Sequence, residues 1–190
     1  ELAHAAGRDP IAFRLDLVRP KSAAAAGVLD AVREMSGWDG DKPAGTGRGV
    51  AMTWSFGTPV AQVVEVRDEG GAIRIARAWV ACDTGVVLDP GILSAQMAGG
   101  LIFGLSAAVH EQITFGDGMV EQLNFPDTDV LRMSGAPQIE TRLLEANPHL
   151  GGGGEPGTPP AAAALANALF DLTGIRARSL PLDRQFSFVL

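Results

Sequence analysis

The sequence has little of several residue types on which common binding and stabilising sites depend. It contains one cysteine, Cys82, so it forms no internal disulfide and has no second thiol for a zinc or iron–sulfur site. We interpret Cys82 as a buried small apolar residue near a strand end. The formal net charge is -7, and no basic cluster is present. This charge argues against a surface that binds nucleic acid or an anionic membrane.

A targeting segment and a membrane span are also missing from the pattern. The chain begins with ELAHAAGRDP, which has neither the initiating methionine nor the basic and apolar regions of a signal peptide. Gly, His or charged residues interrupt the apolar runs before the roughly 18 residues that a membrane span needs. We expect a piece of a longer polypeptide with no membrane span, and both a cytoplasmic and a periplasmic location stay open.

The composition that is present indicates a folded unit. A chain of 190 residues with 46% hydrophobic content is long enough to bury a core. We expect a helical segment over residues 1–45, with Pro10 in a first helical turn and Ser22 as an N-cap. Residues 39–49, DGDKPAGTGRG, are typical of a polar loop. An α+β body over 46–190 completes the domain.

Strands and long helices alternate in blocks through that body. Apolar residues alternate over 50–54 and 60–83, where a Glu-Gly-Gly turn predicts a hairpin inside a three-stranded meander. The other expected elements are a long helix at 89–112, a hairpin at 113–125, a strand at 137–146 and a helix at 161–174 with Gly174 as its C-cap. The pattern predicts an α+β fold with mixed or antiparallel strands and long packing helices.

The least usual stretch is GGGGEPGTPP at 151–160. Four glycines let the backbone approach another group closely, at a cost in unfolded-state entropy. The run has no Lys followed by Ser or Thr, so it does not match a phosphate-binding loop. Two interpretations of Glu155 stay open at this point. It stabilises a helix N-terminus by about 0.3–1 kcal/mol, or it is a base held at a pocket whose wall must be glycine.

A resemblance favours the second interpretation. Residues 151–182 resemble the C-terminal signature of the molybdenum-binding subunit of the xanthine dehydrogenase and aldehyde oxidase family, in particular the isoquinoline 1-oxidoreductase type found in bacteria. Further stretches are similar to that family in the same order and cover nearly the whole chain: 1–18, 47–66, 83–125 and 130–141. Agreement of several motifs in order makes the resemblance specific.

The resemblance implies a hydroxylase that oxidises an aldehyde or an N-heteroaromatic carbon with oxygen from water. It implies molybdenum held by molybdopterin, usually the cytosine dinucleotide, and no metal ligand from this chain. Glu155 would be the general base, Gln96 would bind the pterin, and Gly153 and Gly154 would line the molybdenum site through their backbone. The cofactor supplies the redox chemistry, and the protein supplies placement and electrostatics.

The resemblance also implies partners, because the earlier loops of the family's pocket are absent from this sequence. We expect the N-terminal half of the large subunit, as a segment or a separate chain, and a small subunit that carries 2Fe-2S clusters. The chain alone is then expected to be inactive. The alternative is a non-catalytic assembly module that docks a partner through the small residues of 95–107.

Other candidate residues have simpler interpretations. The stretch Trp54 to Thr58 either approaches the substrate or cofactor or packs into the core. Asp83 is suited to cap the turn at Thr84 and Gly85. His110 and His149 have no partner at metal-ligand spacing, so we interpret both as structural or surface residues.

Overall fold

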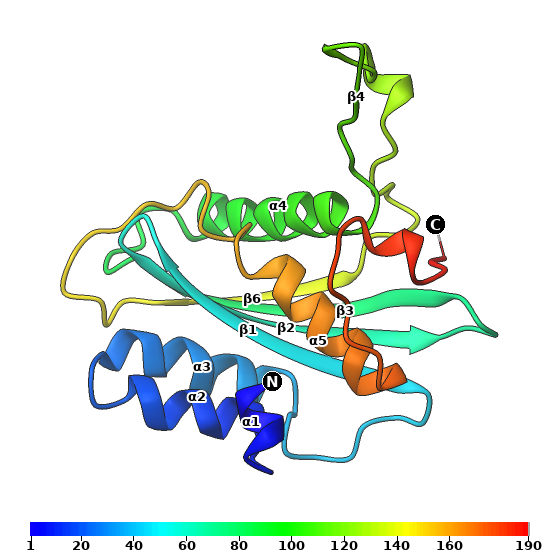
Figure 1. The fold of residues 1–190 in the computed structure, drawn as a ribbon. Coiled ribbons are helices and arrows are strands. Elements are labelled where there is room, and N and C mark those ends of the chain that lie inside the picture. Colours follow the sequence, from blue (N-terminus) through cyan, green and yellow to red (C-terminus); the bar gives the residue numbers. More distant parts are fainter. Residues whose placement is uncertain (190) are drawn as a thin grey trace.

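A mixed four-stranded sheet forms the centre of the structure, a computed structural model that describes residues 1–189 (Figure 1). Its strands, in spatial order, are β1 (Thr46–Ser55), β2 (Thr58–Asp68), β3 (Ile73–Asp83) and β6 (Gln138–Leu144). The first three strands are antiparallel, which confirms the predicted meander, and β6 pairs with β3 in parallel. The predicted α+β class, with mixed strands and packing helices, is confirmed.

The predicted loop at 39–49 is wrong in its second half, because β1 begins at Thr46. Thr46 pairs with Arg67 of β2, and the pairing continues to the hairpin turn. Gly47 and Gly49, which suggested a loop, have a packing role in this strand. A Cβ on either residue would collide with the backbone of α5 (Ala161–Thr173) near Ala168. The glycines therefore let the helix lie directly on the strand.

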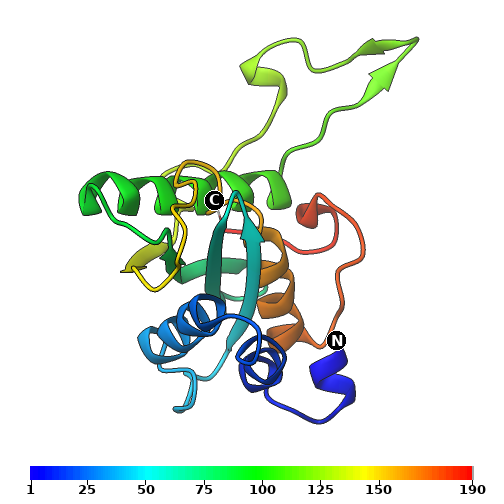
Figure 2. The same cartoon turned by 90° about the vertical axis from the view of Figure 1, so that its left-hand side faces the viewer.

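Helices cover both faces of the sheet (Figures 1 and 2). The N-terminal helices α2 (Pro10–Val18) and α3 (Ala23–Met35) pack on one face with α1 (Leu2–Ala5) beside them, and α4 (Pro90–Val109) and α5 pack on the other. Ser22 caps α3 as predicted, since its Oγ accepts a hydrogen bond of 3.1 Å from the Ala25 backbone N–H. Gly174 ends α5 in the left-handed conformation, with φ of 73°, which confirms the predicted C-cap.

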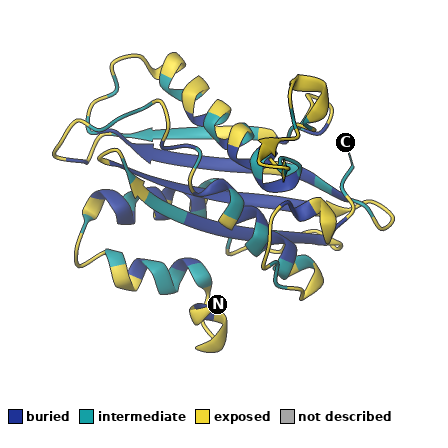
Figure 3. Cartoon of the chain, turned by 45° about the horizontal axis from the view of Figure 1, so that its top comes forward, coloured by how far each residue is buried: buried dark blue, intermediate teal, exposed yellow. Residues whose placement is uncertain are grey.

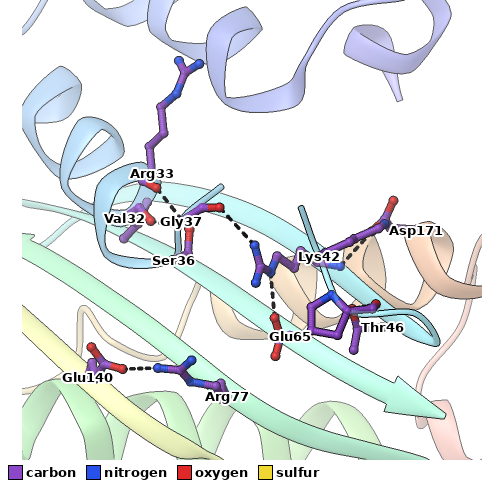
Figure 4. A network of polar contacts seen from close by, with 12 residues as sticks. Val32, Arg33, Ser36, Gly37, Lys42, Thr46, Glu65, Arg77, Glu140 and Asp171 are labelled. Atoms are coloured by element: carbon purple, nitrogen blue, oxygen red, sulfur yellow. Dashed lines mark hydrogen bonds and ion pairs between the residues drawn. The ribbon is translucent and has the colours of Figure 1, made fainter. Parts of the chain in front are cut away.

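The two central strands are buried on both faces, which Figure 3 shows as dark blue at the centre of the sheet. Apolar and polar residues alternate along β2, yet Thr58 to Val66 are all buried. The polar side chains in this strand have specific partners. Glu65 forms a 2.7 Å ion pair with Arg48 of β1, within the network of Figure 4. A buried carboxylate is tolerated because this guanidinium compensates its charge.

Helix α4 is long and apolar enough to cross a membrane by length and composition, although no span was expected from the sequence. Its apolar residues serve the core here, because Met97, Leu101 and Leu105 are fully buried between the helix and the sheet. Length and apolarity alone therefore do not assign α4 to a bilayer, since a core helix has the same composition.

An arm separates α4 from β6 and projects away from the body (Figures 1 and 2). It contains the short strands β4 (Phe115–Gly116) and β5 (Met119–Val120), paired around Asp117 and Gly118, and the 3-10 helix η1 (Phe125–Asp127). The hairpin predicted at 113–125 is confirmed. In its described part, the closing segment from residue 176 contains one helical turn, η2 (Leu182–Arg184).

Candidate functional site

The glycine run lies between the β1–β2 turn and the first half of α4. Its backbone bonds to the turn from both directions: the Gly152 N–H donates to the Phe56 carbonyl at 2.8 Å, and the Thr58 hydroxyl donates to the Gly152 carbonyl at 2.7 Å. The Gly151 N–H also donates to the Thr84 carbonyl at 3.0 Å. The run is therefore an ordered segment, fixed against the hairpin end.

Neighbouring atoms explain why this segment is glycine. A Cβ on Gly151 would lie 2.7 Å from the Gly57 carbonyl oxygen, and one on Gly153 would lie 2.9 Å from Cδ1 of Leu93. At Gly151 the neighbour is backbone, so a side chain has no room there, whereas at Gly153 the neighbour is the flexible end of Leu93. The cost of ordering four glycines is offset by this close approach.

The four predicted site residues come together at this place. Gly153 and Gly154 face α4, where a Cβ on Gly154 would lie 3.5 Å from Nε2 of Gln96. Glu155 follows directly, and both Glu155 and Gln96 are exposed. Neither side chain forms a hydrogen bond within residues 1–189. The structure thus brings the Gln96 amide next to Gly154, the residue before Glu155, although Gln96 and Glu155 are 59 positions apart in the sequence.

Hydrogen bonds and close packing fix the turn that carries Glu155. The Thr158 N–H donates to the Glu155 carbonyl at 3.0 Å, and Pro156 and Gly157 are buried. Gln62 of β2, fully buried, donates from Nε2 to the Gly157 carbonyl at 2.6 Å. A Cβ on Gly157 would lie 2.8 Å from the Met97 carbonyl oxygen of α4. The sheet and α4 together fix the position of the turn.

The start of the same loop has a second buried anchor. Asp83, at the end of β3, is fully buried and accepts hydrogen bonds from the Ala146 and Asn147 N–H groups at 2.9 and 3.0 Å. It also accepts from the Gly85 N–H at 3.1 Å, which is the turn cap expected from the sequence. Asn147 donates from Nδ2 to the Gly57 carbonyl at 2.8 Å. These bonds tie β3, the loop and the β1–β2 turn together.

Helix α5 begins at Ala161 with Pro160 as its N-cap residue, and its N-terminus receives no side-chain hydrogen bond. Glu155 lies six positions before the helix and does not cap it. The helix-capping interpretation of Glu155 therefore has no geometric support.

The remaining candidates have structural surroundings. His110 lies 3.1 Å from the Asp183 carboxylate through Nδ1, and His149 is exposed. Burial raises the pKa of the Cys82 thiol to about 12, with the nearby Asp83 adding to the effect. Within the described residues, no three His, Cys, Asp or Glu side chains gather closely enough to hold a metal ion.

A cavity of about 970 Å³ lies elsewhere, where α1 and α2 face β1 and α5, and none of the four predicted site residues lines it. Several of its charges are matched within the chain. Arg48 pairs with Glu65, and Lys42 pairs with Asp171, as Figure 4 shows. We therefore place the candidate site at the glycine run, where polar groups are free.

Comparison with known proteins identifies the family of the chain. Residues 15–137 match the model of the molybdopterin cofactor-binding domain family. The chain belongs to this family. It is 38% identical to the beta chain of isoquinoline 1-oxidoreductase from Brevundimonas diminuta, over 96% of this chain and 24% of that one. It is 30% identical to a subunit of nicotinate dehydrogenase from Pseudomonas putida, over 97% of this chain and 17% of that one.

Solved structures of molybdopterin enzymes share the fold. The chain matches quinoline 2-oxidoreductase from Pseudomonas putida 86 with a TM-score of 0.56 at 22% identity, over 66% of this chain and 17% of that one. The aldehyde oxidoreductase of Desulfovibrio desulfuricans gives 0.54 at 23% identity, over 65% of this chain and 14% of that one. The chain thus spans about a quarter or less of the length of these relatives, which are molybdenum hydroxylases of the xanthine dehydrogenase and aldehyde oxidase family.

The sequence alone does not identify all of the residues that hold the glycine run in place. The alternation over 60–83 does not distinguish Gln62 from other polar positions, and no motif points to Asn147. Asp83 was expected to cap a turn and does so, but it also holds the loop start. A polar residue in a β-branched run, such as Gln62 between Ala61 and Val63, was the available signal. Only the packed structure identifies the carbonyl that it bonds.

Proposed function

We propose that this chain forms part of the catalytic site of a molybdenum hydroxylase that oxidises an aldehyde or an N-heteroaromatic carbon with oxygen from water. In this proposal Glu155 is the general base. The observation that carries it is the arrangement at the glycine run. There the close-packed backbone runs past the Gln96 amide at Gly154 and leads directly into Glu155, and both side chains are exposed and free to bond.

The residues fit a large cofactor that lies against backbone. Glycines 151 to 154 leave a wall without side chains, and the Gln96 amide next to it both donates and accepts hydrogen bonds, as the edge of a pterin requires. We propose that Gln96 holds the pterin and that Gly153 and Gly154 face the molybdenum end. When bound, molybdopterin, here as the cytosine dinucleotide, supplies the redox chemistry of the hydroxylation.

Glu155 has the task of moving a proton. A general base must lie within hydrogen-bond reach of the proton that it removes, and its position must be fixed. The bond from Gln62 to the Gly157 carbonyl and the turn bond from the Thr158 N–H to the Glu155 carbonyl fix the backbone that follows this residue. The carboxylate then takes up, at its Oε atoms, the proton of the water that provides the oxygen.

The proposal includes partners, because the chain spans only about a quarter of its relatives. The rest of the large subunit would complete the pocket and set the substrate. The 2Fe-2S clusters would lie on a small subunit, since the single buried Cys82 cannot bind one. We expect the chain alone to be inactive and the assembled enzyme to be active.

The test is Glu155→Gln in the assembled enzyme. The amide keeps the size of the side chain but cannot take up a proton, so steady-state turnover should fall by at least about a hundredfold, the lower range for general base catalysis. Molybdenum content, measured by elemental analysis, should stay equal to that of the wild type. Turnover near the wild-type rate would show that another group is the base.

A non-catalytic assembly module is the second candidate function, and the arm favours it. The arm has four large apolar side chains that are between 71% and 97% exposed: Phe115, Leu123, Phe125 and Met133. Exposed apolar surface of this kind is typical of a site that binds a partner. The small residues of 95–107 in α4 were expected to dock the partner, but not all of them are available for it. Gly104 packs against Thr158 and Ala161 of the same chain.

A further inference from the structure

The turn between β1 and β2 has an unusual residue at its tip. Phe56 and Gly57 connect the paired ends Ser55 and Thr58, with φ of 54° and 78°. Both central residues are left-handed, as in the tight hairpin turns that favour Asn-Gly or Asp-Gly. A bulky side chain in this conformation is an outlier, because its Cβ crowds the backbone and costs free energy.

The arm contains the matching turn with the favoured residue. Asp117 and Gly118 have φ of 50° and 79°, nearly the same backbone as Phe56 and Gly57. Among residues 1–189, Phe56 and Asp117 are the non-glycine residues with positive φ. The backbone of Phe56 thus gains nothing from a phenylalanine side chain, so the reason for it must lie in what the ring contacts.

The ring does not stabilise the core. Phe56 is 62% exposed and belongs to neither core cluster. The base of its side chain adjoins the start of the glycine run instead: its Cβ and Cγ are 3.0 and 3.9 Å from the position that a Cβ on Gly152 would take. The Phe56 carbonyl accepts the Gly152 N–H at 2.8 Å, so the two backbones are fixed together.

Phe56 therefore adjoins the same run that leads to Glu155, three residues beyond Gly152. The core-packing interpretation of the stretch from Trp54 to Thr58 is wrong for its aromatic residues, since Trp54 is also half exposed. Backbone strain at an exposed aromatic residue beside a candidate site indicates a functional role for that residue.

We infer that Phe56 is a substrate-binding residue whose ring stacks on a flat N-heteroaromatic substrate. The inference rests on the proposed function and selects one of its two substrate classes. A flat π-system gains from stacking on an exposed phenyl ring, whereas a small aliphatic aldehyde offers no such face.

The test replaces Phe56 with the residue that the turn prefers. In the assembled enzyme, Phe56→Asn should raise the Kd of quinoline about tenfold, the upper range of one aromatic contact, and should leave the Kd of acetaldehyde within twofold. Molybdenum content should not change. The melting temperature should not fall, because Asn relieves the backbone strain of the turn. Phe56→Tyr keeps the ring and should restore quinoline binding.

The matched control is Asp117→Phe, the reverse exchange in the equivalent turn. It should lower the melting temperature and leave the Kd of quinoline unchanged. Binding is measured at equilibrium in the Glu155→Gln background, or as KM if that variant still turns over. A failed base assignment is thereby separated from a failed stacking assignment. An unchanged Kd of quinoline, an equal rise for acetaldehyde, or loss of molybdenum in Phe56→Asn would each overturn the inference.

Discussion

Gln62 combines a stability role and a positioning role in one side chain. Its buried amide is the hydrogen-bond donor to the Gly157 carbonyl, two residues after Glu155. We expect Gln62→Leu to lower the free energy of unfolding by about 1–3 kcal/mol, because that carbonyl loses its donor inside the protein. In the assembled enzyme, kcat should fall on the order of tenfold, since the Glu155 turn loses its support from the sheet. Chemical denaturation and steady-state kinetics measure the two effects.

Asn167 offers a matched control for that substitution. Its amide donates from Nδ2 to the Val50 carbonyl at 3.0 Å and joins α5 to β1, away from the glycine run. Asn167→Ala should also cost stability but should leave kcat unchanged. If the two variants lose activity equally, Gln62 acts only through general stability, and its positioning role is refuted.

Helix α4 shows how one element uses the same residue type in two ways. A Cβ on Gly104 would lie 2.6 Å from the Thr158 carbonyl oxygen, whereas Gly99 faces open space. Alanine is favoured over glycine inside a helix by about 0.8–1 kcal/mol, so Gly99→Ala should stabilise the protein by about that amount. Gly104→Ala should destabilise it by about 1–3 kcal/mol through overpacking. Thermal or denaturant unfolding of the two variants gives the comparison.

The two alanine variants should therefore change stability in opposite directions within one helix. A gain at both positions would mean that the loop at 157–161 yields easily, and that the close contact between α4 and the Glu155 turn does not constrain the site.

At the scale of the whole molecule, the arm and Glu155 are both exposed, outside a core in which helices cover both faces of the sheet. We expect co-expression with the remaining part of the large subunit to give a complex that retains molybdenum, and the chain alone to retain none. Elemental analysis of both preparations measures this. A tight complex without metal would favour the assembly function over the catalytic one.

Much of the fold follows from local pattern. Alternation and turn residues predicted the β1–β2–β3 meander, and caps such as Ser22 and Gly174 predicted helix ends. The start of β1 was misplaced because Gly47 and Gly49 indicate a loop locally, while their actual constraint is the backbone of α5. Such a contact joins residues over a hundred positions apart, and local propensity contains no term for it.

The sequence by itself determined the family and the element order, because ordered motifs and residue types are written in the chain, and it supplied Gln96, Gly153, Gly154 and Glu155 as a prediction. Only the tertiary structure decided that the Gln96 amide lies next to Gly154, that Gln62 and Asp83 hold the loop, and that Phe56 is strained and exposed. The physical reason is that burial, hydrogen-bond partners and close backbone approach are properties of pairs of segments, and those pairs exist only after the sheet and its helices have packed.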